Sequence, residues 1–257
     1  MAERLTPFWK AVVVVLTVLP VLLSINQLFY LRLFGFNPIL EGYLFYILAC
    51  LLPLAFVIYP AKPGQKVQWF DIPLFLIALI VPAYMGHNAQ RIVLEGWERV
   101  APTVPTVLSV LLWFTLLEGV RRAGGRVLMI VCAFFSFFPM FTGHIPIGVL
   151  QGIEYTFVET ARSHIMSQEA LLGAPLETLG NLLIGFLLFG IILVHTGGGN
   201  FFFNLAQALF GRARGGNAKV AVVSSAFFGM LSGSAISNVV TTGSMTIPAM
   251  KRTGFEP

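Results

Sequence analysis

Long apolar stretches alternate with short polar or charged segments along the 257 residues. Residues 11–30 and 42–59 contain no charged side chain, and the later stretches carry few. An α-helix rises about 1.5 Å per residue, so about 20 apolar residues cross about 30 Å of hydrocarbon. The pattern therefore predicts six membrane-spanning helices, over residues 11–30, 42–59, 69–85, 100–117, 127–150 and 179–194.

The composition is that of a membrane protein. Apolar residues make up 57% of the chain, charged residues make up only 11%, and 24 residues are Phe. A soluble domain could not cover so much apolar surface, whereas a lipid bilayer solvates it. We therefore expect an all-α, polytopic membrane protein.

The 16 Lys and Arg residues predict how the chain is oriented. With the N-terminus inside, only Arg32, Arg91, Arg99 and Arg162 lie on the outer side. The other twelve are inside: Arg4, Lys10, Lys62, Lys66, Arg121, Arg122, Arg126, Arg212, Arg214, Lys219, Lys251 and Arg252. Short inner loops are enriched in Lys and Arg, so the N-terminus is predicted to be cytoplasmic. Anionic lipid headgroups then account for the net charge of +5, and we expect no nucleic-acid partner.

Candidate catalytic and metal-binding groups are few. Cys50 and Cys132 lie inside predicted spans, and none of the four His residues has a second ligand at metal spacing. The serine-rich segments have no partnering His or Asp at membrane depth, which disfavours a hydrolase. We therefore predict no enzymatic activity and no bound cofactor.

Three carboxylates adjoin the predicted spans, and each is a functional candidate for that reason. Glu118 lies one helical turn from Arg121 and Arg122, so we expect it to form an ion pair. Asp71 and Glu177 are expected to mark the water-facing ends of their helices.

The charge-free segment 220–250 differs from the spans before it, because its polar residues gather at the centre. The apolar arms on either side, residues 220–231 and 239–250, are each about 18 Å long as helix, which is too short to cross. Basic residues flank both ends of the segment. Two interpretations remain open. The segment forms a re-entrant hairpin over about residues 217–254, or it forms one spanning helix with Gly229, Gly233 and Ser237 on a close-packed face.

Residues 200–210 are short, largely apolar and enclosed by a glycine-rich turn and a basic turn. We expect a separate helix lying along the cytoplasmic surface. The alternative is a continuation of the preceding helix.

Residues 186–255, and above all the run MLSGSAISNVVTTGSMTIPAMKRTGF, resemble the large membrane subunit of tripartite ATP-independent periplasmic (TRAP) transporters. Four preceding spans suggest the fused 4TM/12TM variety of TAXI type. By this resemblance, residues 1–125 are a four-helix small-subunit-like domain, and residues 126–257 are the N-terminal part of the large permease domain.

The resemblance implies an elevator-type, sodium-coupled permease in the bacterial inner membrane. A periplasmic TAXI-type binding protein would deliver a carboxylate-bearing solute to it. The hairpin tip of the family carries the ion and substrate sites, which correspond here to Ser232, Gly233, Ser234, Ser237, Asn238, Thr241, Thr242 and Gly243. We expect Na⁺ at Gly233, Ser237, Asn238 and Thr242, because a hard cation requires oxygen ligands.

The family continues with a second half that bears another hairpin, whereas this sequence stops at Pro257. Transport is therefore expected to need the missing C-terminal half as a partner. The alternatives are a truncated, non-transporting membrane interaction module and a channel.

Overall fold

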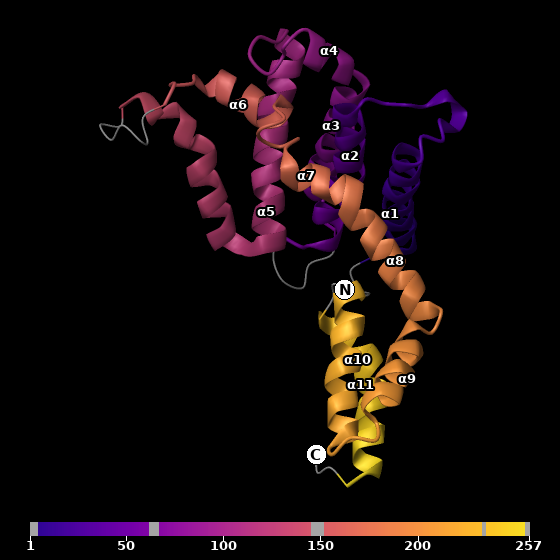
Figure 1. Ribbon diagram of the computed structural model, residues 1–257. Coiled ribbons are helices and arrows are strands. Elements are labelled where there is room, and N and C mark those ends of the chain that lie inside the picture. The colour runs from indigo at the N-terminus through magenta and orange to yellow at the C-terminus, as the bar shows by residue number, and fades with distance from the viewer. Residues whose placement is uncertain (1–4, 62–66, 145–151, 233–234, 255–257) are drawn as a thin grey trace. The chain divides into compact units, whose positions relative to one another are not determined.

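The computed structural model describes residues 5–61, 67–144, 152–232 and 235–254 (Figure 1). Every regular element in these ranges is a helix, so the predicted all-α fold is confirmed. The chain divides into two compact units, Met1–Asn181 and Leu182–Pro257, here called the N-terminal unit and the C-terminal unit.

The N-terminal unit is organised around one central helix, which packs against several others. Its helices are α1 (Pro7–Leu28), α2 (Leu40–Ile58), α3 (Asp71–His87), α4 (Ala89–Leu94), α5 (Thr103–Phe137), α6 (Phe157–Met166) and α7 (Ala174–Thr178). The central helix is α2, which contacts α1, α3 and α5 and fully buries Tyr43, Phe45 and Phe56. A nearly continuous apolar sequence suits a helix that is covered on several sides.

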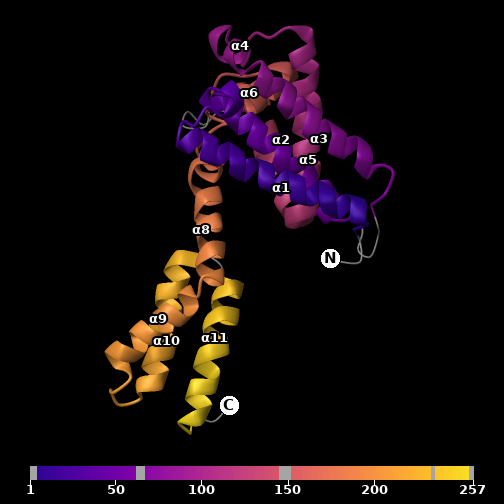
Figure 2. The same ribbon diagram turned by 90° about the vertical axis from the view of Figure 1, so that its right-hand side faces the viewer.

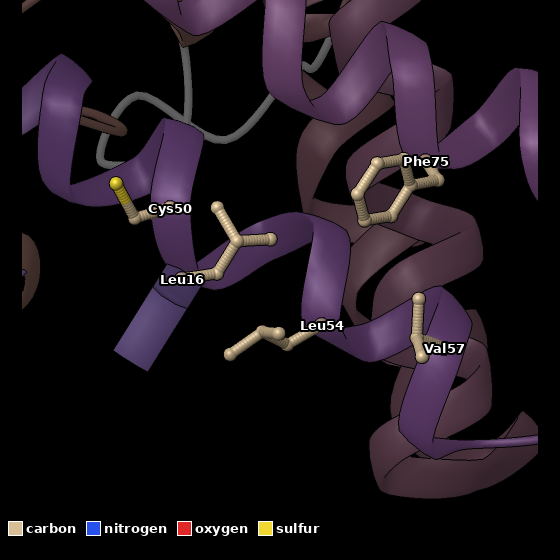
Figure 3. Packing of buried hydrophobic residues seen from close by; sticks show 5 residues of the cluster. All are labelled: Leu16, Cys50, Leu54, Val57 and Phe75. Atoms are coloured by element: carbon tan, nitrogen blue, oxygen red, sulfur yellow. The ribbon is translucent and has the colours of Figure 1, made fainter. Parts of the chain in front are cut away.

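A small apolar cluster joins three of these helices (Figure 3). Leu16 of α1 and Phe75 of α3 belong to one core cluster with Cys50, Leu54 and Val57 of α2. The three α2 residues are spaced by four and three positions, which places them on one face of that helix. Cys50 thus serves as a small apolar side chain in the core.

The helix α5 is sharply bent at Gly125, whose φ of 87° and ψ of 174° are not helical. The ring of Trp113 before the bend lies 4.7 Å from the ring of Phe137 after it, so the two arms fold back on each other. This bend separates the predicted fourth and fifth spans. Trp113 is only 3% exposed, so its ring is buried where the two arms meet.

The predicted fifth span, residues 127–150, is longer than the helix that forms there. After Phe137 the chain continues in two short 3-10 turns, Phe138–Met140 and Thr142–His144, and residues 145–151 lie outside the described ranges. Pro139 contributes to the early end, because proline lacks the N–H group that would continue the α-helical hydrogen bonds.

Four helices in the described ranges are long and apolar enough to cross a membrane: Pro7–Leu28, Leu40–Ile58, Thr103–Met140 and Ala174–Leu193. The helix Asp71–His87 is apolar but shorter. The chain is therefore a multi-pass helical membrane protein. Its predicted sixth span begins as a π-helical turn, Leu179–Leu183, and continues as α8 (Ile184–His195).

The C-terminal unit contains α8 and three further helices, α9 (Gly198–Phe210), α10 (Gly216–Ser232) and α11 (Ala235–Arg252). Gly197, with φ 87°, separates α8 from α9, so the predicted helix over residues 200–210 is indeed distinct from the one before it. The last three helices pack against one another (Figure 2). The cytoplasmic position of α9 stays a prediction.

The helices α10 and α11 form an antiparallel pair. The Asn238 amide bonds to Ser225 near one end, and the Asn217 amide bonds to Thr253 near the other. The interpretation of residues 220–250 as one continuous helix is therefore wrong. The arms are also longer than predicted, at 17 and 18 residues, because the polar and basic residues at the base continue each helix.

Candidate ion and substrate site

The predicted ion and substrate residues lie at the end of α10 and in the first half of α11. Ser232 is the last residue of α10, Gly233 and Ser234 lie outside the described residues, and the side chain of Ser237 also falls outside the description. The four other predicted residues, Asn238, Thr241, Thr242 and Gly243, are on α11.

The polar run from residue 235 onward is helical. Two hydroxyl groups in this run bond back into their own helix. Thr242 Oγ1 donates to the carbonyl oxygen of Asn238 at 2.7 Å, and Ser244 Oγ donates to that of Thr241 at 2.8 Å. Serine and threonine therefore remain compatible with helix here, because the helix itself satisfies their hydroxyl groups.

Asn238 is the residue that ties the pair together. Its Nδ2 donates to the carbonyl oxygen of Ser225 at 3.0 Å and to Ser225 Oγ at 3.1 Å. Its Oδ1 lies 3.3 Å from Thr242 Oγ1. The donors of the amide are thus directed at α10, and its oxygen lies beside a second oxygen on α11. Two neutral oxygen atoms this close can both contact one hard cation.

Two glycines that the sequence did not single out for the tip make this geometry possible. A Cβ atom on Gly229 would lie 2.9 Å from Asn238 Nδ2, so only glycine lets α10 approach here without a shift. A Cβ atom on Gly199 of α9 would lie 2.6 Å from Thr241 Cγ2. Thr241 therefore packs against α9. Gly243 is a helical residue of α11 without a positive φ.

The interior of the three-helix arrangement is partly polar. Ser224 is fully buried, and Thr242 and Thr246 are 6% and 7% exposed. Spaced by four residues, the two threonines share one face of α11. Polar side chains between helices are common in membrane proteins, because hydrogen bonds across the interface help to hold apolar helices together.

The sequence analysis also missed the hydrogen bonds at the base of the pair. Asn217 Nδ2 donates to Thr253 Oγ1 at 2.9 Å and to the carbonyl oxygen of Ala249 at 3.2 Å. The presence of an Asn and a Thr at opposite ends of a charge-free segment was the available signal. Its meaning depends on the antiparallel register, which residue spacing alone does not reveal.

The candidate carboxylates of the N-terminal unit are largely used in ion pairs. Glu118 accepts from Arg121 Nε and Nη2, each at 2.6 Å, and from Arg122 Nε at 2.8 Å, which confirms the predicted pairing. Asp71 is the first residue of α3, and its side chain is buried at 1% exposure and contacts Arg122 at 2.6 Å. That this end of α3 faces water stays a prediction. The adjacent guanidinium group of Arg122 compensates the negative charge of the buried Asp71 carboxylate, which water would otherwise solvate. Glu177 lies in the first turn of α7.

Membrane-length helices followed by a polar, glycine-packed helix pair are an architecture found in membrane transport proteins. The family model for the tripartite ATP-independent periplasmic transporter, DctM component, matches residues 111–257, which is more than half of the chain. The chain therefore belongs to this family of TRAP transporter permeases.

A curated relative agrees with this assignment. The chain is 26% identical over 189 residues to the isethionate TRAP transporter permease protein DctMQ of Oleidesulfovibrio alaskensis. The alignment covers 72% of this chain but only 30% of the relative, so the chain spans less than a third of that protein's length. No solved structure matches the chain. The predicted division at residues 125 and 126 stays a prediction.

Proposed function

We propose that the chain is the N-terminal portion of a sodium-coupled TRAP permease that takes up a small organic anion. The observation that carries this proposal is the antiparallel pair α10–α11, in which Asn238 and Thr242 place neutral oxygen atoms beside a glycine-lined helix contact. This pair lies within the region that matches the DctM family. We infer further that the pair is re-entrant and moves as part of an elevator.

The chemistry of the C-terminal unit supports sodium as the coupling ion. Its described residues, 182–232 and 235–254, contain no Asp or Glu, so a bound cation would be held by carbonyl, amide and hydroxyl oxygens. Such ligands suit a monovalent cation that must be released again during transport, and helix ends supply the remaining field. We assign Gly233, Ser237, Asn238 and Thr242 as candidate Na⁺ ligands, with Ser232, Ser234, Thr241 and Gly243 around them.

An organic anion is the proposed substrate class. The curated relative is named for isethionate, and the family resemblance points to a carboxylate-bearing solute delivered by a periplasmic binding protein of TAXI type. We propose the fused 4TM/12TM arrangement in the bacterial inner membrane, with the N-terminus in the cytoplasm. The C-terminal half of the family's permease would complete the transport path.

Uptake into proteoliposomes tests the function directly. The chain is reconstituted with a complementing C-terminal permease half and a cognate binding protein, and labelled dicarboxylate and isethionate are offered under an inward Na⁺ gradient. We expect uptake that needs all three proteins and stops when K⁺ replaces Na⁺. Uptake that is equally fast without the binding protein or without a gradient would favour a channel. Binding-protein docking without any uptake would favour a non-transporting interaction module.

A further inference from the structure

One end of the C-terminal unit gathers five basic residues, and we call it the basic end. The loop between α9 and α10, the start of α10 and the end of α11 all lie at this end (Figure 2). The hydrogen bond between Asn217 Nδ2 and Thr253 Oγ1, 2.9 Å long, fixes the start of α10 beside the end of α11. The basic end consists of Arg212, Arg214, Lys219, Lys251 and Arg252, all of them exposed.

Within the described residues of the C-terminal unit, these cations have no carboxylate to pair with. No Asp or Glu occurs in residues 182–232 and 235–254, and no ion pair involves the five side chains within the described chain. In the N-terminal unit, by contrast, Arg121 and Arg122 are paired with a carboxylate, because both donate hydrogen bonds to Glu118. The basic end is therefore a concentrated positive field that no carboxylate among the described residues of the C-terminal unit neutralises.

An exposed apolar face leads directly to the basic end. Phe201, Leu205 and Leu209 of α9 are 61%, 37% and 60% exposed, and their spacing of four residues places them in one row. Gly198, Gly199 and Ala206 of the same helix are buried, so α9 has one packed side and one apolar open side. Arg212 follows two residues after the end of this helix.

We propose that the basic end binds the phosphate groups of anionic phospholipids, whose acyl chains lie along the Phe201, Leu205 and Leu209 row of α9. The apolar row can contact the acyl chains of such a lipid, and the cations at the end of the row can bind its phosphate group. A free phosphate would bind the cations but leave the row uncovered, and a nucleic acid would leave Leu205 and Leu209 of the row uncovered. Lipid therefore fits both halves of the surface.

Native mass spectrometry of the full chain in detergent measures this binding. Phosphatidylglycerol is titrated against the chain, and phosphatidylcholine serves as the lipid without net charge. We expect the double variant Arg214→Gln/Lys251→Gln to bind phosphatidylglycerol at least tenfold more weakly, because each cation near an anionic surface contributes about fivefold, or about 1 kcal/mol. Phosphatidylcholine binding should not change.

A matched control removes two charges from the other unit. Lys10→Gln/Arg126→Gln alters the net charge equally and also lies on the predicted inner side, so it should leave phosphatidylglycerol binding unchanged. The variant Arg214→Lys keeps the charge and should bind as the parent chain does. Circular dichroism is measured for each variant. Unchanged helicity would show that weaker lipid binding does not come from misfolding.

Several outcomes would overturn the proposal. Equal losses in the test and control pairs would show a general charge effect, and equal binding of both lipids would show that only the apolar belt is involved. Competition experiments separate the other anions. Displacement of the lipid by inorganic phosphate at similar concentrations would indicate a free-anion site, and displacement by a short RNA would indicate a nucleic-acid surface. None of these outcomes depends on transport activity, so the lipid site and the transport function fail separately.

Discussion

The guanidinium group of Arg122 lies 2.6 Å from the carboxylate of Asp71, although the two residues are 51 positions apart. Both side chains are almost completely buried, at 1% and 2% exposure. Arg122 also bonds to Glu118 at 2.8 Å and lies 5.0 Å from the ring centre of Phe56. One arginine therefore joins α2, α3 and α5 three residues before the bend at Gly125.

Breaking this pair should unfold the N-terminal unit at a lower temperature. Arg122→Gln leaves the Asp71 carboxylate buried without its main cation, and such changes cost about 3–5 kcal/mol. Intrinsic fluorescence during heating in detergent measures the shift in Tm. Arg99→Gln is the matched control, because Arg99 is 85% exposed and 4.0 Å from Glu98, a contact worth about 0–1 kcal/mol. Equal Tm values for both variants would contradict a structural role for the buried pair.

A second long-range contact holds the π-helical turn. Tyr43 Oη donates to the carbonyl oxygen of Gly180 at 2.6 Å and lies 2.9 Å from Ser24 Oγ. A Cβ atom on Gly180 would lie 3.0 Å from Tyr43 Cε1 and 3.2 Å from Leu44 Cδ2. Glycine is therefore needed where the turn meets α2.

Gly180→Ala should destabilise the protein by about 1–3 kcal/mol, because the added methyl group overpacks a closed contact. Gly185→Ala is the control, since a Cβ atom there meets nothing within 4 Å and alanine favours helix. We expect a lower Tm for the first variant and an equal or higher Tm for the second. A Gly180→Ala protein as stable as Gly185→Ala would show that the contact relaxes without cost.

The sequence predicted the local features of the structure and missed the long-range ones. Charge-free runs located the helices, and the one-turn spacing of Glu118 and Arg121 revealed their ion pair. Asp71 and Arg122 belong to different helices, and their contact depends on how those helices are rotated and packed. Periodicity carries no such information, because it specifies which face is apolar but not which helix covers it.

The candidate site follows the same rule. The polar centre of residues 220–250 left a helix pair and a single helix open, and the structure contains the pair. The register of the pair, which brings Asn238 to Ser225, could not be read from the sequence. A glycine inside a helix, such as Gly229, indicates a close helix contact. The sequence analysis placed Gly229 on the packed face of a single helix, whereas it lies against Asn238 of α11.

The first turn of α6 should respond to pH. Hydrogen bonds from the Thr156 hydroxyl and backbone N–H, at 2.7 and 2.8 Å, lower the pKa of Glu159 below its usual value, with help from Arg162. A lowered pKa means that the stabilisation is present above the ordinary carboxylate range and is lost as pH falls through the folded-state pKa.

Hydrogen exchange at the start of α6 checks this effect. At neutral pH, the backbone amide hydrogen of Thr156 should exchange faster in Glu159→Gln than in the parent chain. The reason is that the neutral glutamine is a weaker acceptor in the capping box than the ionised carboxylate. The two proteins should become equal once pH falls below the folded-state pKa of Glu159. A difference that persists unchanged at acidic pH would mean that ionisation of Glu159 does not hold the cap.

The predicted orientation can be tested by labelling single cysteines in a background where Cys50 and Cys132 are replaced by alanine. Leu94, which is 85% exposed on α4, is predicted to lie outside, and Ala123, next to the bend in α5, is predicted to lie inside. An impermeant maleimide should modify Leu94→Cys but not Ala123→Cys in intact cells. Permeabilised cells should label both. The reverse pattern in intact cells would invert the topology.

The role of Asn238 is the sharpest test of the ion site, because its amide already bonds to the neighbouring helix. Ser225→Ala and Asn238→Ala both remove interhelical hydrogen bonds, each worth about 1 kcal/mol, so both should lower Tm modestly. If Asn238 Oδ1 also binds Na⁺, only Asn238→Ala should raise the Na⁺ concentration needed for half-maximal uptake in the completed transporter. Thr242→Ala should also raise this Na⁺ concentration, because the Thr242 hydroxyl lies 3.3 Å from Asn238 Oδ1. A shift of the same size in Ser225→Ala would assign the effect to helix pairing, and unchanged Na⁺ dependence in all three variants would remove these side chains from the site.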